Sequence, residues 1–424
     1  MYNLIKKLMP LNRSIAGPAN LLTLLELKKV NQKLNIKYFK SKKKVFDWEV
    51  PNEWIVKDAW IKKINGEKVL DFKNNNLHIV NYSIPKKETL IRLKDLKKKI
   101  FSIKEMPLAI PYITSYYKRN WGFCMTYSKL KNLTDEKYII KIDSKIFPGK
   151  MNYGEILIKG KSKKEILLTT YICHPSMANN ELSGPSLLIH LSKWIQNKKR
   201  KYSYRILFLS ETIGSIAYIH KNIKDLKKKV LAGYVITCVG DDRTVSYVPS
   251  RNGNSIADKS ALNILKKLKY KFKKFSWLER GSDERQFCWP NLDLPVCSVT
   301  RSKYHTYPEY HTSLDTLDGV VTKKGLNTSI NIYKKILLDI EEKIFPVSTS
   351  VCEPMLSKYN LYPKLGFYKK NDKNKNKSKL ILNILSFCDG SNSLEEISQK
   401  CKIRLFLCQK IINLMSKKKL IKLI

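Results

Sequence analysis

The chain has 424 residues, 43% of them hydrophobic, which is enough for a globular core and for two or three domains. Its formal charge of +45 comes mostly from lysines in short, evenly spread clusters, which is typical of solvated surfaces rather than of a nucleic-acid groove. No stretch reaches the ~18 uninterrupted apolar residues of a membrane span, no secretory signal is visible, and nine cysteines without a CxxC pair indicate a reducing cytoplasm.

The sequence pattern of the first half of the chain changes twice. Residues 19–34 carry apolar positions at helical spacing and predict an amphipathic helix. Short alternating runs rich in Trp, Val, Ile and Tyr follow, with a hairpin signal at Asn65-Gly66. We therefore expect a small β domain at 45–124, inserted into an α/β domain formed by 1–44 and 125–345. Its strands should lie outside the main sheet, and its two ends should lie close together.

The α/β domain is predicted from apolar runs that alternate with helical stretches. A strand buried on both faces is expected at 166–172, and further strands at 153–160, 205–210, 234–240 and 294–300. This alternation predicts a mostly parallel sheet covered by helices.

The C-terminal part begins after a polar run at 370–379, from which we assign a linker at 346–379. Residues 380–424 contain three short amphipathic helices and a final apolar strand, which is typical of a winged helix. Ser393 and Glu396 form a capping box at the second helix. Because the third helix is rich in Leu, Ile and Phe, it offers few side chains for base edges, and we expect it to pack against a protein rather than bind DNA.

Polar side chains follow two of the predicted strands directly. His174 comes after the strand at 166–172 and is followed by Asn180 and Glu181, while Glu211 comes directly after the strand at 205–210. The carboxyl ends of parallel strands meet at one edge of a sheet, where ligands bind. We therefore expect these side chains to share a site.

Three further stretches supply groups of the same kind. Asp241 ends another strand, Asp283 lies in a turn, and His311 and Asp315 follow the strand that ends at Thr300. Singly, each has a structural alternative, such as a helix cap or a structural histidine. Together they are typical of a zinc hydrolase, in which imidazoles and carboxylates bind the metal and a Glu takes a proton from water.

Several motifs carry a resemblance to a known family. ANNELSG, ETIG, SDERQF and YHTSLDT, in this order, resemble the signature of zinc-dependent aminopeptidases, the family that includes bacterial leucyl aminopeptidases and glutamate carboxypeptidase. NRSIAG, VFDWEVPNEW, PYITSYYKRNWGFC and YICHPS are similar to one bacterial branch of aminopeptidase-like proteins. That branch has an inserted β domain of unknown function and a C-terminal winged helix, and it is often found with polysaccharide biosynthesis genes. The resemblance covers nearly the whole chain.

The resemblance implies roles for five residues. Glu211 stands where these aminopeptidases have their general base. His174 and His311 would be zinc ligands, and Asp283 and Asp315 would support the site.

The chain departs from the wider family at other ligand positions. The Asp that bridges two zinc ions in the family falls on Asn180, with a carboxylate displaced to Glu181. A second ligand falls on Thr212 and a third on Thr237, although Asp241 stands close by. An amide oxygen brings no charge to offset the metal. We therefore expect one zinc ion, held by His174, His311 and a nearby carboxylate, rather than two.

These observations lead to two function hypotheses. The first is a zinc-dependent, aminopeptidase-like hydrolase that cleaves an amide bond in a peptide or in an acylated amino sugar precursor. The alternative is a non-catalytic scaffold or binding protein that keeps the fold and has lost its metal, with the winged helix as its interaction surface. The zinc content of the purified protein distinguishes them.

Overall fold

The computed structural model describes residues 1–134, 136–362 and 373–423, so the start of the polar run at 370–379 lies outside the described residues. It divides into two compact units, Met1–Ile336 and Leu337–Ile424. Among the described residues, every helix is too short or too polar to cross a bilayer.

The first unit contains a mixed eight-stranded sheet in the order β1-β10-β12-β11-β13-β16-β14-β15. Its four central strands, β12, β11, β13 and β16, run parallel, whereas β1, β10 and β14 pair antiparallel. All residues of β11 are buried, as its unbroken apolar run predicts. The strands are β1 (Asn35–Lys40), β10 (Lys150–Ile158), β11 (Glu165–Tyr171), β12 (Ser203–Leu209), β13 (Val230–Val235), β14 (Val245–Val248), β15 (Phe272–Lys274) and β16 (Val296–Thr300).

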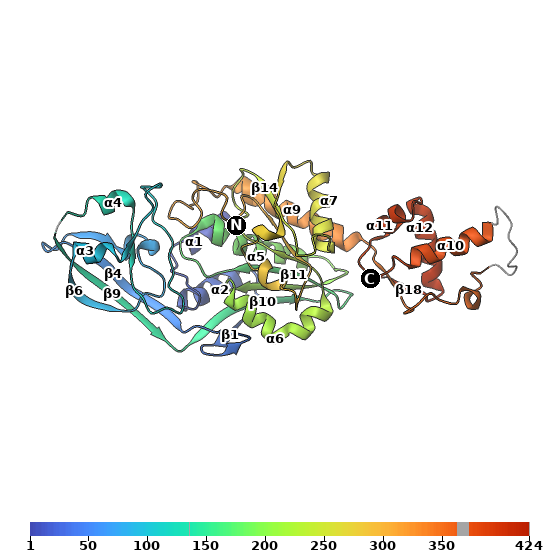
Figure 1. Ribbon diagram of the computed structural model, residues 1–424, viewed down its shortest axis with the longest axis horizontal. Helices are drawn as coiled ribbons and strands as arrows, with labels where there is room; N and C mark the ends of the chain where they lie inside the picture. Colours follow the sequence, from blue (N-terminus) through green and yellow to red (C-terminus); the bar gives the residue numbers. More distant parts are fainter. Residues whose placement is uncertain (135, 363–372, 424) are drawn as a thin grey trace. The chain divides into compact units, whose positions relative to one another are not determined.

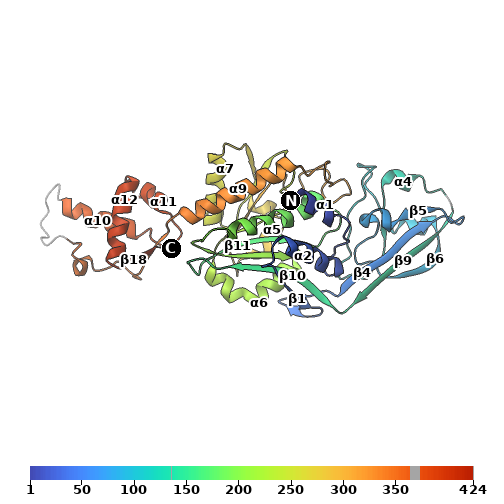
Figure 2. The same ribbon diagram turned by 180° about the vertical axis from the view of Figure 1, so that it is seen from behind.

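Helices cover both faces of this sheet. Figures 1 and 2 show α5 and α6 on opposite sides of the strands. The α/β architecture predicted from the sequence, a sheet covered by helices, is thereby confirmed, although the sheet is mixed because three of its pairings are antiparallel. The helices of this unit are α1 (Tyr2–Leu8), α2 (Pro18–Val30), α5 (Ser183–Gln196), α6 (Ile213–Lys229), α7 (Ile256–Lys267), α8 (Glu284–Phe287) and the start of α9 (Lys323–Glu342). Of these, α1 had no expectation from the sequence, and α2 ends at Val30 rather than at residue 34.

The inserted segment forms its own four-stranded sheet in the order β5-β4-β9-β6, outside the eight-stranded one. The turn at Gly66, with φ +92°, joins β4 to β5 as the hairpin signal predicts. The elements are β2 (Lys44–Val45), β3 (Trp48–Glu49), β4 (Glu53–Lys62), β5 (Lys68–Asp71), β6 (Lys86–Arg92), α3 (Leu93–Lys97), β7 (Ile100–Phe101), β8 (Phe123–Cys124), α4 (Tyr127–Lys131) and β9 (Lys137–Phe147), with short 3-10 turns η1 (Phe72–Asn74) and η2 (Asn76–His78).

The boundary of the insertion differs from the expected one at residue 124. Strand β9 lies beyond it and pairs with both β4 and β6, so the inserted sheet extends to Phe147. The chain then passes directly into β10 of the main sheet. The two ends of the segment lie side by side, because Lys40 pairs with Lys150 in one sheet and Glu53 with Phe147 in the other.

The second unit has the elements of a winged helix. Strands β17 (Pro346–Ser348) and β18 (Ile421–Leu423) pair antiparallel, and the capping box of Ser393 and Glu396 begins α11 as predicted. Leu356, in the turn η5, is buried in the same apolar cluster as the helices. The helices are α10 (Lys373–Leu385), α11 (Leu394–Lys400) and α12 (Leu405–Lys417).

The described residues at 346–379 therefore differ from the expected linker. They include β17, η5 (Leu356–Tyr359) and the first half of α10. β17 supplies the pairing partner that β18 needs, and Leu356 contributes to the core. Lysine is a good helix former, so a polar lysine-rich run continues an amphipathic helix as readily as it forms a linker.

Candidate functional site

The site begins where β11 ends. After His174 the chain makes a π-helical turn, η3 (Ala178–Leu182), whose five residues are all buried, and continues into α5. Gly184 permits this close packing, because a Cβ there would lie 2.4 Å from the carbonyl oxygen of Ile236 and 2.4 Å from Oγ1 of Thr170. π-turns occur often at functional sites. This turn brings Asn180 and Glu181 to the carboxyl edge of the sheet.

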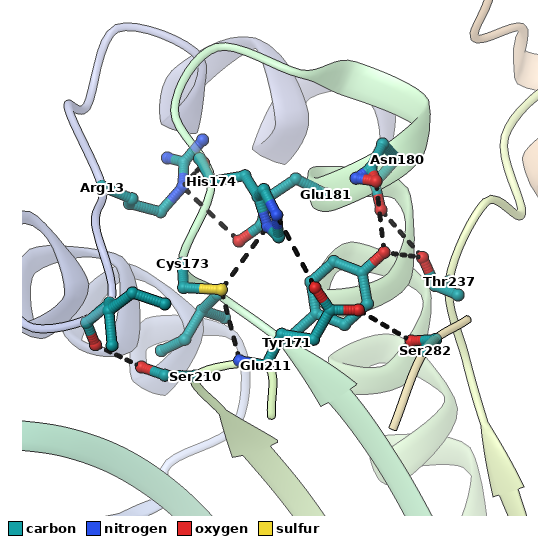
Figure 3. A network of polar contacts seen from close by, with 12 residues as sticks. Arg13, Tyr171, Cys173, His174, Asn180, Glu181, Ser210, Glu211, Thr237 and Ser282 are labelled. Carbon is teal, nitrogen blue, oxygen red and sulfur yellow. Dashed lines mark hydrogen bonds and ion pairs between the residues drawn. The ribbon is translucent and has the colours of Figure 1, made fainter. Parts of the chain in front are cut away.

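His174 is held by a buried network (Figure 3). Its Nδ1 lies 2.8 Å from Oε2 of Glu181 and 3.4 Å from Sγ of Cys173. Burial lowers the pKa of His174 to about 3, so the ring is neutral, and with Glu181 ionised the ring hydrogen would lie on Nδ1. The lone pair of Nε2 then faces Oε2 of Glu211, 3.7 Å away. A carboxylate behind an imidazole is the usual way of orienting a metal-binding or basic histidine.

Arg13 completes this network from the N-terminal segment. Its side chain is fully buried, its Nε donates to the carbonyl oxygen of His174 (2.9 Å), and the same nitrogen lies 3.9 Å from Oε1 of Glu181. Burial raises the pKa of Glu181, and the charge of Arg13 opposes that shift. Residue-by-residue reasoning gave Arg13 no role. The NRSIAG motif was the signal that could have found it.

Glu211 projects from a strained turn after β12. Its neighbour Thr212 has φ +64° and ψ −79°, which is rare for a β-branched residue. Two contacts hold this geometry: Thr212 N donates to Oδ1 of Asp283 (2.7 Å), and Arg285 Nη2 donates to Thr212 Oγ1 (2.6 Å). Asp283 therefore acts on the turn that presents Glu211.

The carboxyl group of Glu211 is mostly buried but still reaches solvent. Its side chain is 18% exposed, and Ser282 Oγ donates to Oε1 at 3.1 Å. Burial and the nearby charge of Asp283 raise the pKa of Glu211. A carboxyl group with a raised pKa near a neutral imidazole has the properties expected of a general base.

The ring of His311 lies beside that of His174, with a distance of 5.3 Å between their centroids. Its ring stacks on Tyr310 at 3.9 Å, and burial, together with His174, lowers its pKa to about 2. Nε2 of His311 is buried and has no hydrogen-bond partner among the described residues. A buried, neutral, unpaired nitrogen is suited to a ligand or a metal ion.

Tyr112 packs edge-on against both histidine rings, at 5.1 Å from His174 and 5.3 Å from His311. Its backbone nitrogen donates to the carbonyl oxygen of His311 (2.8 Å). Tyr112 belongs to the segment expected to form the inserted domain, so that segment reaches the site itself. The PYITSYYKRNWGFC motif was the only signal in the sequence for this contact, and it predicted no site residue.

Two predicted site carboxylates face the protein interior instead. Asp315 accepts from the backbone nitrogens of Asn179 (2.7 Å) and Asn180 (2.9 Å), which fixes η3. Asp241, expected as a metal candidate, accepts from Ser302 N, Ser302 Oγ and Asn179 Nδ2. Their hydrogen bonds give both residues a positioning role.

The positions that would hold a second metal ion carry neutral groups. The hydroxyls of Tyr171 and Thr237 lie 2.6 Å apart, and the Tyr171 hydroxyl donates to Oδ1 of Asn180 (3.3 Å). Thr237 also donates to the carbonyl oxygen of Asn180 (2.8 Å). Neutral oxygens that already share hydrogen bonds do not fit a second zinc ion.

The donor set fits a single zinc ion. Among the described residues, the ligand atoms of Cys173, His174 and Glu181 lie within 4.8 Å of one another, but two of these contacts share Nδ1 of His174, so the group orients that ring. Nε2 of His174 and the unpaired Nε2 of His311 have the chemistry that zinc prefers, and the carboxyl group of Glu211 lies 3.7 Å from the first of them. The ligand atoms of His174, His311 and Glu211 are not all within 4.8 Å of one another, so binding of a zinc ion would draw these side chains closer together.

A cavity of about 320 Å³ opens beside Glu211. Larger cavities elsewhere, at Glu155 and Arg205 and at Lys40–Lys43, contain none of the predicted site residues. The lining residues of the cavity are Ile15, Trp48, Pro51, Tyr82, Tyr116, Tyr117, Glu211, Thr212, Ile213 and Arg285.

The chain is similar to a protein known by sequence and to a solved crystal structure, both from Clostridium acetobutylicum. One is named as a polysaccharide biosynthesis protein with an aminopeptidase-like domain, a provisional name, and is 41% identical over 401 residues, covering 94% of this chain and 91% of that protein. The other is a crystal structure provisionally named as a peptidase. It has a TM-score of 0.80 and 38% identity, and the match covers 100% of this chain and 96% of that one.

A zinc aminopeptidase from Bacillus subtilis shares the fold, with a TM-score of 0.58 over 80% of this chain and 93% of that one, at 13% identity. Residues 344–423 match the family described as winged helix-turn-helix. Residues 2–343 match the family described as domain of unknown function DUF4910, and the chain therefore belongs to that family.

Proposed function

We propose that this protein hydrolyses the amide bond of an acylated amino sugar precursor, with Glu211 as the general base. The observation that carries the proposal is the arrangement at the strand ends: the Glu211 carboxylate lies 3.7 Å from the free nitrogen of a buried, neutral His174. The cavity beside Glu211 supplies room for a substrate. An amino sugar is preferred to a peptide because a relative of 41% identity bears a polysaccharide biosynthesis name.

In this mechanism each residue of the site has one task. Glu211 accepts the proton of the attacking water and returns it to the leaving nitrogen. Asp283 holds the Thr212 turn that aims Glu211, and Glu181 keeps hydrogen on Nδ1 of His174. His174 and His311 would hold one zinc ion, which when bound would polarise the amide carbonyl and make water more acidic.

The second candidate function is a binding protein without metal. The neutral groups at Asn180, Thr212 and Thr237 favour it, since they remove carboxylates that a two-zinc site needs. In that case the cavity would bind its ligand without cleaving it.

The zinc content of the purified full-length chain tests the metal assignment. We expect close to one zinc ion per chain, reduced well below one in His311→Asn, and no second ion at any zinc concentration that leaves the protein folded. A chain without zinc after purification in zinc-containing buffer would support the binding protein instead.

Turnover is tested separately. The protein is incubated with N-acetylated amino sugars, and the free amine is measured by mass spectrometry. We expect release of the amine, with loss of release after chelation and recovery on adding zinc. No release from free or nucleotide-linked amino sugars would contradict the proposed substrate.

A further inference from the structure

The cavity beside Glu211 has two walls from different parts of the chain. The segment expected to form the inserted domain contributes Trp48, Pro51, Tyr82, Tyr116 and Tyr117. The α/β domain contributes the polar end, where Glu211 and Arg285 lie. The inserted segment therefore supplies aromatic surface next to the groups that would carry the chemistry.

Three of these aromatic side chains are strongly exposed to solvent. Trp48 is 41% exposed, Tyr116 46% and Tyr117 51%. Aromatic groups gathered at a surface hollow usually mark a contact with a ligand or partner. Their position around one cavity, rather than across a flat face, favours a small ligand.

The backbone at this wall is held in a rare conformation. Tyr82 has φ +65° and Tyr116 has φ +46°, both in the region that normally favours glycine. The Tyr82 hydroxyl donates to the carbonyl oxygen of Asn52 (2.9 Å) and accepts from Ala16 N (3.0 Å), which fixes its ring between the two parts of the chain. Such conformations cost free energy and persist where the surroundings impose them, often at binding sites.

The polar end of the cavity has an unused donor. Arg285 Nη2 binds Thr212 Oγ1, but Arg285 Nε has no hydrogen-bond partner among the described residues. Among the described residues no carboxylate oxygen lies within 4.0 Å of Arg285, so its charge is not neutralised by direct contact, although it opposes the rise in the pKa of Glu211. Because Arg285 lines the cavity, a carbonyl or anionic oxygen of a ligand can contact its guanidinium group.

We propose that the inserted segment forms the binding site for the sugar ring of the acylated amino sugar. The apolar CH face of the ring lies on Trp48 and Tyr116, and the acyl amide points to Arg285 and Glu211. A volume of about 320 Å³ is at the small end of ligand cavities and fits one monosaccharide unit. This inference rests on the proposed function, whose substrate it specifies.

A second cavity of about 310 Å³ continues the first and shares Pro51, Tyr82, Tyr116 and Tyr117 with it. Lys118 and Arg119 also line this second cavity, together with one carboxylate, Glu49. Two cations against one anion give it a net positive charge, which suits a phosphate group attached to the sugar. The amino sugar can thus come from either a free or a nucleotide-linked source.

Calorimetric titration of the full-length chain tests the site. The probes are N-acetylglucosamine, its uridine diphosphate conjugate, and N-acetylphenylalaninamide as the peptide-like competitor. We expect Tyr116→Ala and Trp48→Ala to raise the Kd for the sugar about tenfold, as expected from the loss of an aromatic contact. Trp289→Ala, at an exposed tryptophan outside the cavity, is the matched control and should leave the Kd unchanged. Tyr116→Phe keeps the ring and should bind like the parent.

The outcomes separate this inference from the proposed hydrolysis. Binding that Glu211→Gln retains and Tyr116→Ala weakens supports the sugar site even where no amide is cleaved. Tighter binding of the nucleotide conjugate, reduced by Arg119→Ala, identifies the nucleotide-linked source, and equal binding identifies the free sugar. The inference is overturned if neither sugar binds, if Tyr116→Ala and Trp48→Ala bind as well as the parent, or if N-acetylphenylalaninamide binds more tightly than both sugars.

Discussion

At the scale of single residues, Glu211 decides whether the protein is an enzyme. Glu211→Gln keeps the shape of the side chain and its contact with Ser282 but removes its basicity. We expect turnover to fall about 10²-fold to 10⁴-fold, with fold and zinc content kept. Steady-state rates of amine release measure the loss. A variant as active as the parent would refute Glu211 as the base.

Arg13 is expected to matter for stability. Arg13→Met removes the cation beside the buried carboxyl of Glu181 and leaves the carbonyl oxygen of His174 without its side-chain donor. We expect the free energy of unfolding to fall by about 3 kcal/mol, measured by urea denaturation.

Two further variants complete the Arg13 test. Arg92→Met, at an exposed arginine, should change the stability by less than about 0.5 kcal/mol. Adding Glu181→Gln to Arg13→Met should recover part of the loss, because the buried acidic group is then gone. Equal effects of Arg13→Met and Arg92→Met would show that the buried contact contributes nothing.

The functional residues at the strand ends were easier to predict from the sequence than the residues that hold them in place. His174 and Glu211 follow buried strands, and that pattern is visible in the sequence. Arg13 and Tyr112 come from distant segments, and their contacts depend on how those segments cross the sheet edge. The same limit explains Asp241, which stands at a strand end but is turned toward Ser302.

At the scale of elements, the start of α5 depends on Gly184. Gly184→Ala would place a methyl group 2.4 Å from a backbone carbonyl oxygen, so the helix start and η3 must shift. We expect a loss of about 2 kcal/mol in the free energy of unfolding, measured by urea denaturation.

Gly214→Ala is the matched control for this change. Gly214 also lies near a helix start, in α6, but the nearest atom to its added Cβ is the Cβ of Ser210 at 3.3 Å. Alanine favours helix by up to ~1 kcal/mol over glycine, so this variant should be nearly neutral or more stable. Equal losses in the two variants would show that close packing at Gly184 is not the cause.

Five strands of the main sheet, β10, β11, β12, β13 and β16, were predictable because each contains an apolar run, although β13 begins at Val230 rather than at 234. The short strands β14 and β15 and the lysine-containing β1 had no such signal and were not predicted. The extent of the inserted sheet was also not predicted, because β9 resembles any amphipathic strand until its partners β4 and β6 are known. The first half of helix α10 was not predicted as helix, because its polar residues carry no pattern that distinguishes a helix from a linker.

At the scale of the whole molecule, the two units have separate cores. The apolar cluster of the second unit draws its described members from Leu356 to Ile421, all within Leu337–Ile424. We therefore expect a fragment covering Leu337–Ile424 to fold alone. Circular dichroism should show cooperative thermal unfolding of helix in this fragment, and a fragment without helix or without a transition would contradict the prediction.

The pairing of β1 with β10 has a consequence for the order of folding. Lys40 and Lys150 stand 110 positions apart and must meet to complete the edge of the main sheet. Once β4 has paired with β9, only residues 41–52 and 148–149 remain to be closed, which lowers the entropic cost of that meeting by about 2 kcal/mol. We therefore expect the inserted sheet to form before β1 pairs with β10. In pulse-labelled hydrogen exchange during refolding, amides of β4 and β9 should become protected before those of β1.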